Sequence, residues 1–286
     1  MTILVIGGTG RIGQSAVKTL KNANKQTTVL SRSVDKINNL PIETNGVLGD
    51  LEKPDTLADA FKGIDKLLLI TANGETETQR GINAVNAAQA SKVEKIIFIS
   101  VKLSEAAMKV PHYASKVPIE KAIKESGINY TILRPDFFYQ NDLLLEKPLT
   151  LAGLYTMPIG NIGQNRIDTR DVGDATVRAL IENQFDGMEI PLYGPKSWTA
   201  DEIAEIYSDK LGRGVRYAGD DLEAWAESSK AFMPPWLVLA LKAGFAKMQA
   251  MGSVATDEEI KVSEDVVGHP LRRFEDFVSE ITKKWK

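Results

Sequence analysis

The 286-residue sequence contains no cysteine and only two histidines. Without cysteine, the chain can form no disulfide, hold no thiolate nucleophile and offer no cysteine ligand to a metal. The histidines, His112 and His269, lie far apart in the sequence, and His269 precedes a proline in a predicted turn. We therefore expect no metal site. A chain without cysteine also suits a reducing compartment.

An excess of basic charge is also missing, because the formal net charge is −3 at pH 7. This balance disfavours a nucleic-acid partner. The most apolar late stretch, residues 236–251, is interrupted by Lys242 and Lys247 and is too short to cross a bilayer. No basic segment followed by an apolar one, as in a secretory signal, is visible at the start. We expect a cytoplasmic protein with no membrane partner, either a monomer or a homodimer.

A glycine-rich turn follows a short apolar run at residues 3–6, which is typical of a buried parallel strand. Gly8, Gly10 and Gly13 fit the pattern G-x-G-x-x-G, and a helical pattern begins directly after them. Such glycines allow a tight turn, close approach of the backbone to a pyrophosphate and close helix packing. The pattern predicts dinucleotide binding. The expected contacts are Gly7, Thr9, Gly10, Arg11, Ile12 and Gly13.

The choice of dinucleotide is predicted from the end of the second strand, where Arg32 follows residues 27–31. An NAD site usually has an acidic residue here, which binds the ribose 2′-hydroxyl. A guanidinium instead suits a 2′-phosphate, and Arg11 is a second cation within reach. We predict NADP(H). The alternative is that both arginines are solvated loop residues.

Strand and helix patterns then alternate through the first half of the chain. The further strands are expected at residues 46–48, 65–70, 95–99 and 129–133. This alternation predicts an α/β fold, a Rossmann-type doubly wound parallel sheet. We expect an NADP-binding domain at residues 1–150, to which the chain crosses back at about 166–195, and a smaller α+β C-terminal substrate lobe formed mainly by residues 151–286.

Ligands of such sheets bind beyond the carboxyl ends of the strands. The residues expected there are Asp50, Leu51, Thr71, Ala72, Asn73, Ser100, Pro135, Phe137 and Phe138. Asp50 suits either the adenine amino group or a turn or cap, and the aromatic residues suit either a cofactor and substrate wall or the core.

Chemistry is expected in the segment from His112 to Lys116. Pro118 indicates that a helix begins near Ser115, with Ser115 as a possible N-cap. At that position Lys116 could exchange a proton and bind the cofactor ribose. The alternatives are a solvated lysine and a structural or exposed histidine.

Patterns in the second half predict further helices. Asp171 is expected to cap a helix at 172–182, and Thr199 with Glu202 forms a predicted capping box. An apolar stripe of the helix near Trp236 suits the core or an oligomer contact, or else a lid over an apolar ligand. Its members are Leu237, Leu241, Phe245 and Met248.

Taken together, these motifs resemble the NmrA-like family of atypical short-chain dehydrogenases. The matching segments are GGTGRIG at 7–13, LSR at 30–32, GDL at 49–51, SGINYTILRP at 126–135, IDTRDV at 167–172 and GHPLRRFEDF at 268–277. The resemblance implies a Rossmann domain with a small C-terminal lobe. It also implies one of two activities: NAD(P)H-dependent reduction of quinones, azo compounds or triphenylmethane dyes, or NADP-binding redox sensing without evident catalysis.

The catalytic motif departs from that of typical short-chain dehydrogenases, which carry Tyr-x-x-x-Lys. Here His112 stands in the place of the tyrosine, and Tyr113 is displaced by one position, or about 100° around a helix. Lys116 still matches, and Ser100 is near the usual strand-end serine. The resemblance thus implies Lys116 as catalytic residue and leaves His112 and Tyr113 as candidates.

Two hypotheses follow. In the first, the protein is a reductase that transfers hydride from NADPH to a small apolar conjugated acceptor such as a quinone or azo compound, for which water can supply the proton. In the second, it is a non-catalytic NADP(H) sensor that acts through a protein partner. The aromatic residues around Phe137 and the retained Lys116 favour the reductase.

Overall fold

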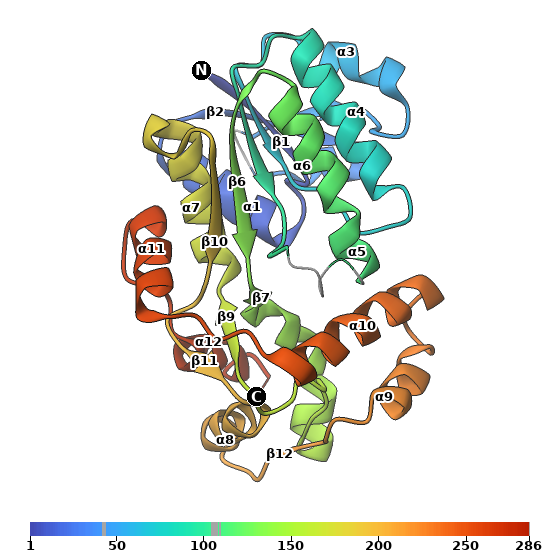
Figure 1. Cartoon of the computed structure of the whole chain (residues 1–286), viewed down its shortest axis with the longest axis vertical. Helices are drawn as coiled ribbons and strands as arrows, with labels where there is room; N and C mark the ends of the chain where they lie inside the picture. The colour runs from blue at the N-terminus through green and yellow to red at the C-terminus, as the bar shows by residue number, and fades with distance from the viewer. Residues whose placement is uncertain (42–43, 104–107, 109, 286) are drawn as a thin grey trace.

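The computed structural model describes residues 1–41, 44–103, 108 and 110–285. Seven parallel strands form its main sheet, in the order β10-β6-β5-β4-β1-β2-β3 (Figure 1). These are β1 (Thr2–Ile6), β2 (Gln26–Ser31), β3 (Asn45–Leu48), β4 (Lys66–Leu69), β5 (Lys95–Ile99), β6 (Asn129–Pro135) and β10 (Met188–Leu192). The Rossmann-type sheet predicted from the sequence is confirmed.

Helices cover both faces of this sheet because its strands are apolar on both sides. Along β1, Ile3 and Val5 pack into one core and Leu4 and Ile6 into the other. The first core lies under α1 (Arg11–Asn22), α7 (Thr169–Ile181) and α11 (Asp257–Val267). The second lies under α3 (Leu57–Ala60), α4 (Glu77–Ala90) and α6 (Lys116–Glu125). Short helices α2 (Val34–Asn38), η1 (Pro54–Thr56) and η5 (Asn183–Phe185) complete this half.

The strand order reverses between β1 and β4. The chain runs from β1 outward to β2 and β3, and then from β4 outward in the opposite direction. Ile6 is level with Leu30 on one side and with Leu69 on the other, so the three strands end together. The segments that follow them meet at this edge, which is where ligands bind in open α/β sheets.

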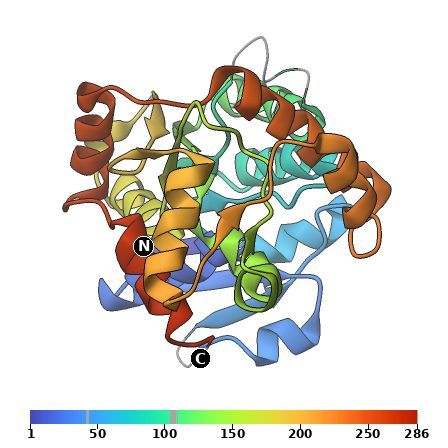
Figure 2. The same ribbon diagram turned by 90° about the horizontal axis from the view of Figure 1, so that it is seen from below.

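A smaller body of short strands and helices lies beyond this edge of the sheet (Figures 1 and 2). Its strands are β7 (Phe137–Phe138), β9 (Gln164–Ile167) and β11 (Ser197–Trp198) in one sheet and β8 (Leu154–Tyr155) and β12 (Arg216–Tyr217) in another. Its helices are η3 (Tyr139–Leu145), η4 (Pro148–Ala152), α8 (Ala200–Leu211), α9 (Leu222–Ser229), α10 (Pro235–Met251) and α12 (Phe274–Thr282). The chain returns to the main sheet after this body begins, because β10 pairs with β6. The division near residue 150 stays a prediction.

A buried ion pair joins β9 to η3 inside this body. The guanidinium of Arg166 donates two hydrogen bonds to Asp142, at 2.6 and 3.0 Å, and both side chains are fully buried. The rings of Phe137 and Phe274 lie 5.4 and 4.7 Å from the guanidinium carbon. The ring of Phe137 therefore packs against a buried cation.

Two helix starts test the capping predictions. The Thr199 and Glu202 capping box is confirmed at α8. The Asp171 prediction is wrong, because α7 begins at Thr169 and its N-cap is Asp168, whose carboxylate accepts from the N–H of Arg170 at 2.8 Å. Asp171 lies in the first turn and accepts from Arg272 instead. The tertiary partner, 101 residues away, decides its role.

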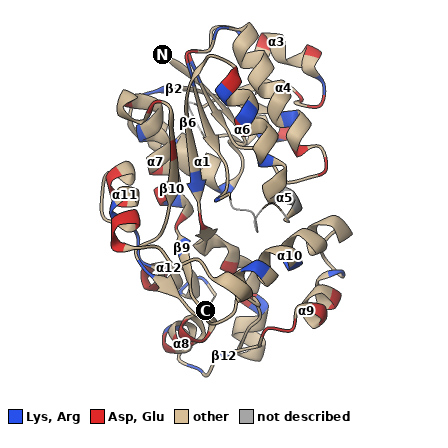
Figure 3. Cartoon of the chain, viewed as in Figure 1, with Lys and Arg blue, Asp and Glu red and all other residues tan. Residues whose placement is uncertain are grey.

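No helix within the described ranges is both long enough and apolar enough to cross a membrane. Acidic and basic residues occur on helices of both halves of the molecule (Figure 3).

Candidate cofactor and substrate site

The glycine turn closes tightly against β1 and the end of β4. Gly7 has φ +80°, and a Cβ on it would lie 2.6 Å from the carbonyl oxygen of Ile70. A Cβ on Gly13 would lie 2.2 Å from the carbonyl oxygen of Gly7. Gly10 is the N-cap of α1 and has no side chain that could accept from the helix N–H groups. The first N–H groups of α1 therefore stay available to a ligand. This geometry fits a bound pyrophosphate.

Two cations lie beside this turn. Arg11 begins α1 and Arg32 follows β2, and both side chains are exposed. Neither has a hydrogen-bond or ion-pair partner among the residues that the structure describes. Both are thus available to a phosphate, and their role as 2′-phosphate ligands stays a prediction.

Other predicted residues at the turn and the strand ends make contacts within the protein. Asp50 accepts from the N–H of Glu52 at 3.0 Å, which is a turn contact of the kind that the sequence left open. The carbonyl oxygens of Thr9, Leu51 and Ala72 accept side-chain hydrogen bonds from Gln14, Asn83 and Arg80, at 3.0, 2.7 and 2.7 Å. These bonds hold the loops at the strand ends.

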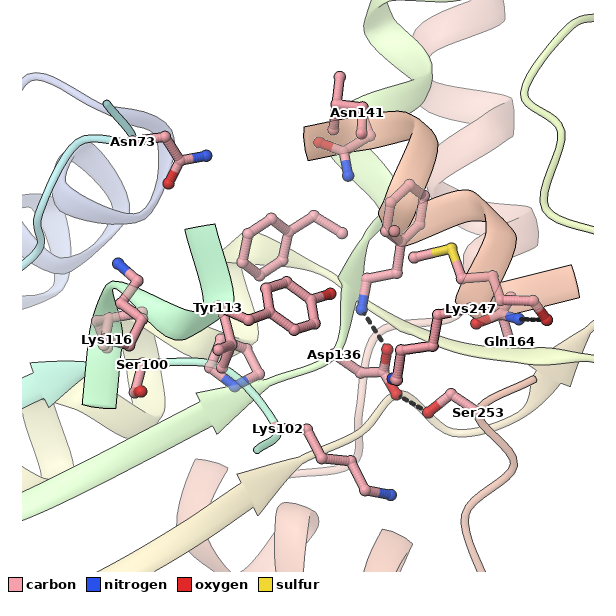
Figure 4. Close-up of a pocket in the computed structure, with 18 of the residues that line it drawn as sticks. Asn73, Ser100, Lys102, Tyr113, Lys116, Asp136, Asn141, Gln164, Lys247 and Ser253 are labelled. Carbon is pink, nitrogen blue, oxygen red and sulfur yellow. Dashed lines mark hydrogen bonds between the residues drawn. The ribbon is translucent and has the colours of Figure 1, made fainter. Parts of the chain in front are cut away.

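A cavity of about 300 Å³ opens at the strand-order reversal, between the main sheet and α10. The residues predicted for the site that line it are Ile12, Thr71, Asn73, Ser100, Tyr113, Lys116, Pro135, Phe137 and Phe138 (Figure 4). Leu241, Phe245 and Met248 of α10 line its opposite side, so three members of the apolar stripe face this cavity. Phe137 and Phe138 line the cavity too, and each ring also packs against a hydrophobic core.

Lys116 begins α6 and is almost completely buried, at 5% exposure. Its Nζ donates to Glu77 at 2.5 Å and to Thr71 at 2.8 Å. Glu77, in the first turn of α4, has no exposed surface and also accepts from Thr71 and Ser115, both at 2.7 Å. Burial lowers the pKa of Lys116, and the carboxylate of Glu77 opposes that shift. Ser115 therefore precedes the helix as predicted, but its hydroxyl serves Glu77 instead of capping α6.

The hydroxyl of Ser100 donates to Glu120 at 2.6 Å, and both residues are buried. Glu120 also accepts two hydrogen bonds from Arg134, at 3.1 and 2.6 Å. The proton of Ser100 is thus directed away from the cavity and into an ion-pair cluster under β6. In this arrangement Ser100 offers a ligand only its oxygen lone pairs.

Tyr113 lies in the short helix α5 (Pro111–Ala114) and lines the cavity (Figure 4). Burial, with the nearby charge of Asp136, raises the pKa of Tyr113 to about 12. The phenol is therefore protonated at neutral pH and can donate a hydrogen bond to a ligand. The backbone of His112 is in the same helix, and its side chain lies outside the described residues.

Several polar residues of the cavity were not assigned from the sequence. Those that line it are Lys102, Asp136, Asn141, Gln164, Lys247 and Ser253. Asp136 stands inside the Arg-Pro-Asp-Phe-Phe segment and could have been singled out as a strand-end carboxylate. The others carry no motif, although Lys102 stands only two residues after Ser100.

Asp171, Asp174 and His269 bring potential ligand atoms within 4.8 Å of one another. The guanidinium of Arg272 binds both carboxylates, and His269 lies 3.1 Å from Asp174. Arg272 thus already supplies positive charge to these oxygens, and the group links α7 to the C-terminal segment.

A family model described as the NmrA-like family matches residues 1–278. The chain belongs to the NmrA-like family. This NmrA-like chain is 28% identical over 281 residues to an NAD(P)H azoreductase of Xenophilus azovorans, and the match covers 96% of each protein.

Two solved structures show the same fold. One is an NADPH-dependent quinone oxidoreductase of Escherichia coli in complex with NADPH, with a TM-score of 0.87, 23% identity and coverage of 98% of this chain and 99% of that one. The other is NmrA, a negative transcriptional regulator, in complex with NADP, with a TM-score of 0.82, 17% identity and coverage of 99% and 95%. The NmrA-like fold thus occurs in an oxidoreductase and in a regulator.

Proposed function

We propose that this protein is an NADPH-dependent reductase that delivers hydride to a small apolar conjugated acceptor such as a quinone or azo compound. The observation that carries the proposal is the cavity at the strand-order reversal, which extends from Ile12 beside the glycine turn to Leu241, Phe245 and Met248 of α10. A cofactor on the turn would thus reach a space lined by aromatic and aliphatic side chains. The azoreductase and quinone oxidoreductase among its relatives support the same activity.

The residues present fit NADP(H). Gly7, Gly10 and Gly13 form a turn so tight that a Cβ on any of them would meet backbone oxygen. The start of α1 has free N–H groups, and Arg11 and Arg32 are cations without partners in the described chain. When bound, the reduced cofactor supplies a hydride from its nicotinamide ring. The protein's task is then to hold donor and acceptor in contact.

Side chains of the cavity would provide that orientation. Lys116, which is held by Glu77 and Thr71, would donate a hydrogen bond to a cofactor ribose hydroxyl. Pro135, Phe137 and Phe138 line the cavity on one side and α10 on the other, which excludes water from the reacting atoms. Quinones and azo compounds place the added charge on oxygen or nitrogen, so water or the Tyr113 hydroxyl can supply the proton.

The test is consumption of NADPH by the purified protein with a panel of quinones and azo dyes. We expect turnover in the wild type, a loss of at least tenfold in kcat/KM for Lys116→Ala, and loss of the preference for NADPH over NADH in Arg32→Ala. Lys36→Ala, an exposed lysine on the neighbouring helix α2, is the matched control and should leave the preference unchanged. Absence of turnover across the panel would contradict the proposal.

A sensor of NADP(H) is the second candidate. The hydroxyl of Ser100 donates to the buried Glu120, so it directs no proton into the cavity, and the ammonium of Lys116 is held by the buried Glu77. The related NmrA structure contains NADP. Calorimetric titration distinguishes the two: a sensor should bind NADP+ and NADPH with clearly different dissociation constants and oxidise no NADPH with any acceptor.

A further inference from the structure

Lys247 is a lysine of the cavity lining that makes no hydrogen bond or ion pair with the described residues. It lies on α10 next to Met248 and lines the cavity, and the ring of Tyr113 is 5.9 Å from its Nζ. It has no hydrogen-bond or ion-pair partner within the part of the chain that the structure describes. By contrast, Lys242, one and a half turns earlier on the same helix, pairs with Glu223. Figure 4 shows Lys247 reaching from α10 toward Asp136.

The other charged groups of the cavity have partners. Lys116 is neutralised by Glu77, and Lys102 donates to the hydroxyl of Tyr193 at 2.5 Å. Asp136 accepts from the N–H of Phe137 at 2.7 Å with one oxygen and from the hydroxyl of Ser253 with the other. Its carboxylate is therefore already satisfied by two hydrogen bonds.

The charge balance of the lining is positive. The cavity is lined by Lys102, Lys116, Lys247 and Asp136, and Glu77 lies directly behind Lys116. The lining itself thus carries three lysines and one aspartate. Burial lowers the pKa of Lys247, although Asp136 opposes this shift, while burial raises the pKa of Asp136. Burial is the main cause of both shifts, which shows that the two groups lose hydration at the cavity wall.

A half-buried ammonium beside an apolar surface loses hydration that an anionic ligand would replace with a charge-assisted hydrogen bond. We infer that Lys247 is a specificity-determining residue that selects acceptors carrying an acidic group, such as a carboxylate or sulfonate, on the conjugated ring. The inference rests on the proposed function in taking the cavity's ligand as an electron acceptor. The conjugated ring would pack on Phe137 and Phe245 while its acidic group faces Lys247.

Equilibrium binding tests this without any turnover. Isothermal titration calorimetry would compare 1,4-naphthoquinone with 1,4-naphthoquinone-2-sulfonate, which share a ring system and differ in charge, in the presence of saturating NADP+. We expect the wild type to bind the sulfonate about tenfold more tightly than the neutral quinone. Lys247→Gln should reduce this preference to about twofold or less, whereas Lys247→Arg should retain most of it.

The matched control is Lys242→Gln, which removes a paired lysine from the same helix and should keep the wild-type preference. Equal affinity of the wild type for the two ligands would overturn the inference, as would a preference that survives in Lys247→Gln or is lost equally in Lys242→Gln. NADPH oxidation is measured separately. A protein that selects the sulfonate through Lys247 but oxidises no NADPH would uphold the charge selection and contradict the reductase proposal.

Discussion

Replacing Glu77 by glutamine should strongly destabilise the protein. Glu77 is fully buried and accepts hydrogen bonds from Lys116, Thr71 and Ser115. Glutamine has nearly the same shape, but it removes the negative charge that lies 2.5 Å from the buried ammonium. Breaking a buried ion pair by removing one partner costs about 3–5 kcal/mol, out of a typical total stability of about 5–15 kcal/mol.

A double-mutant cycle measured by urea unfolding would test this reasoning. We expect Glu77→Gln and Lys116→Met each to lower the free energy of unfolding by about 3–5 kcal/mol. The double variant leaves no uncompensated charge, so it should be more stable than the sum of the single losses implies, by at least about 2 kcal/mol.

Glu125→Gln is the matched control, because Glu125 pairs with Lys121 at 3.8 Å on the exposed face of α6. Glu125→Gln should lower the free energy of unfolding by less than about 1 kcal/mol. Two results would refute the buried-pair reasoning: a loss for Glu77→Gln as small as that of the control, or single losses that simply add in the double variant.

Three further predictions concern acid stability, the glycine turn and the cavity phenol. Burial raises the pKa of Asp174, but hydrogen bonds, including one from His269, outweigh burial and leave the pKa below 3.8. The ionised carboxylate therefore stabilises the fold above pH 3.8, and this contribution to the free energy of unfolding is lost as the pH falls through the lower pKa of the folded state. Urea unfolding at pH 6 and pH 3 should therefore show a smaller acid loss in Asp174→Asn than in the wild type. Gly13→Ala should weaken NADPH binding at least tenfold in a calorimetric titration because its Cβ meets backbone, whereas Gly214→Ala, with nothing within 4 Å and away from the cavity lining, should change affinity little. The Tyr113 pKa of about 12 predicts that Tyr113→Phe leaves the shape of the pH profile of turnover between pH 6 and 9 unchanged, and a new or lost inflection there would contradict it.

Local features were predictable from the sequence by itself. The turn at residues 7–13 could be recognised because its glycines are needed within a few residues of one another, as a Cβ on Gly13 would collide with the backbone of Gly7. The strands were predictable because a parallel strand buried on both faces needs a continuous apolar run. The capping box at Thr199 was predictable because it depends on residues three positions apart.

Only the tertiary structure decided how the side chains of the site are paired. Ser115 stands at the predicted helix start, yet its hydroxyl donates to Glu77, 38 residues earlier. Asp171 was predicted as a cap, but Arg272 reaches it from the other end of the chain. Lys247 shares its helix with Lys242, and tertiary packing places Lys242 against Glu223 and Lys247 at the cavity. Sequence spacing determines what a residue does within a few positions, whereas charge pairing depends on which distant elements the folded chain brings together.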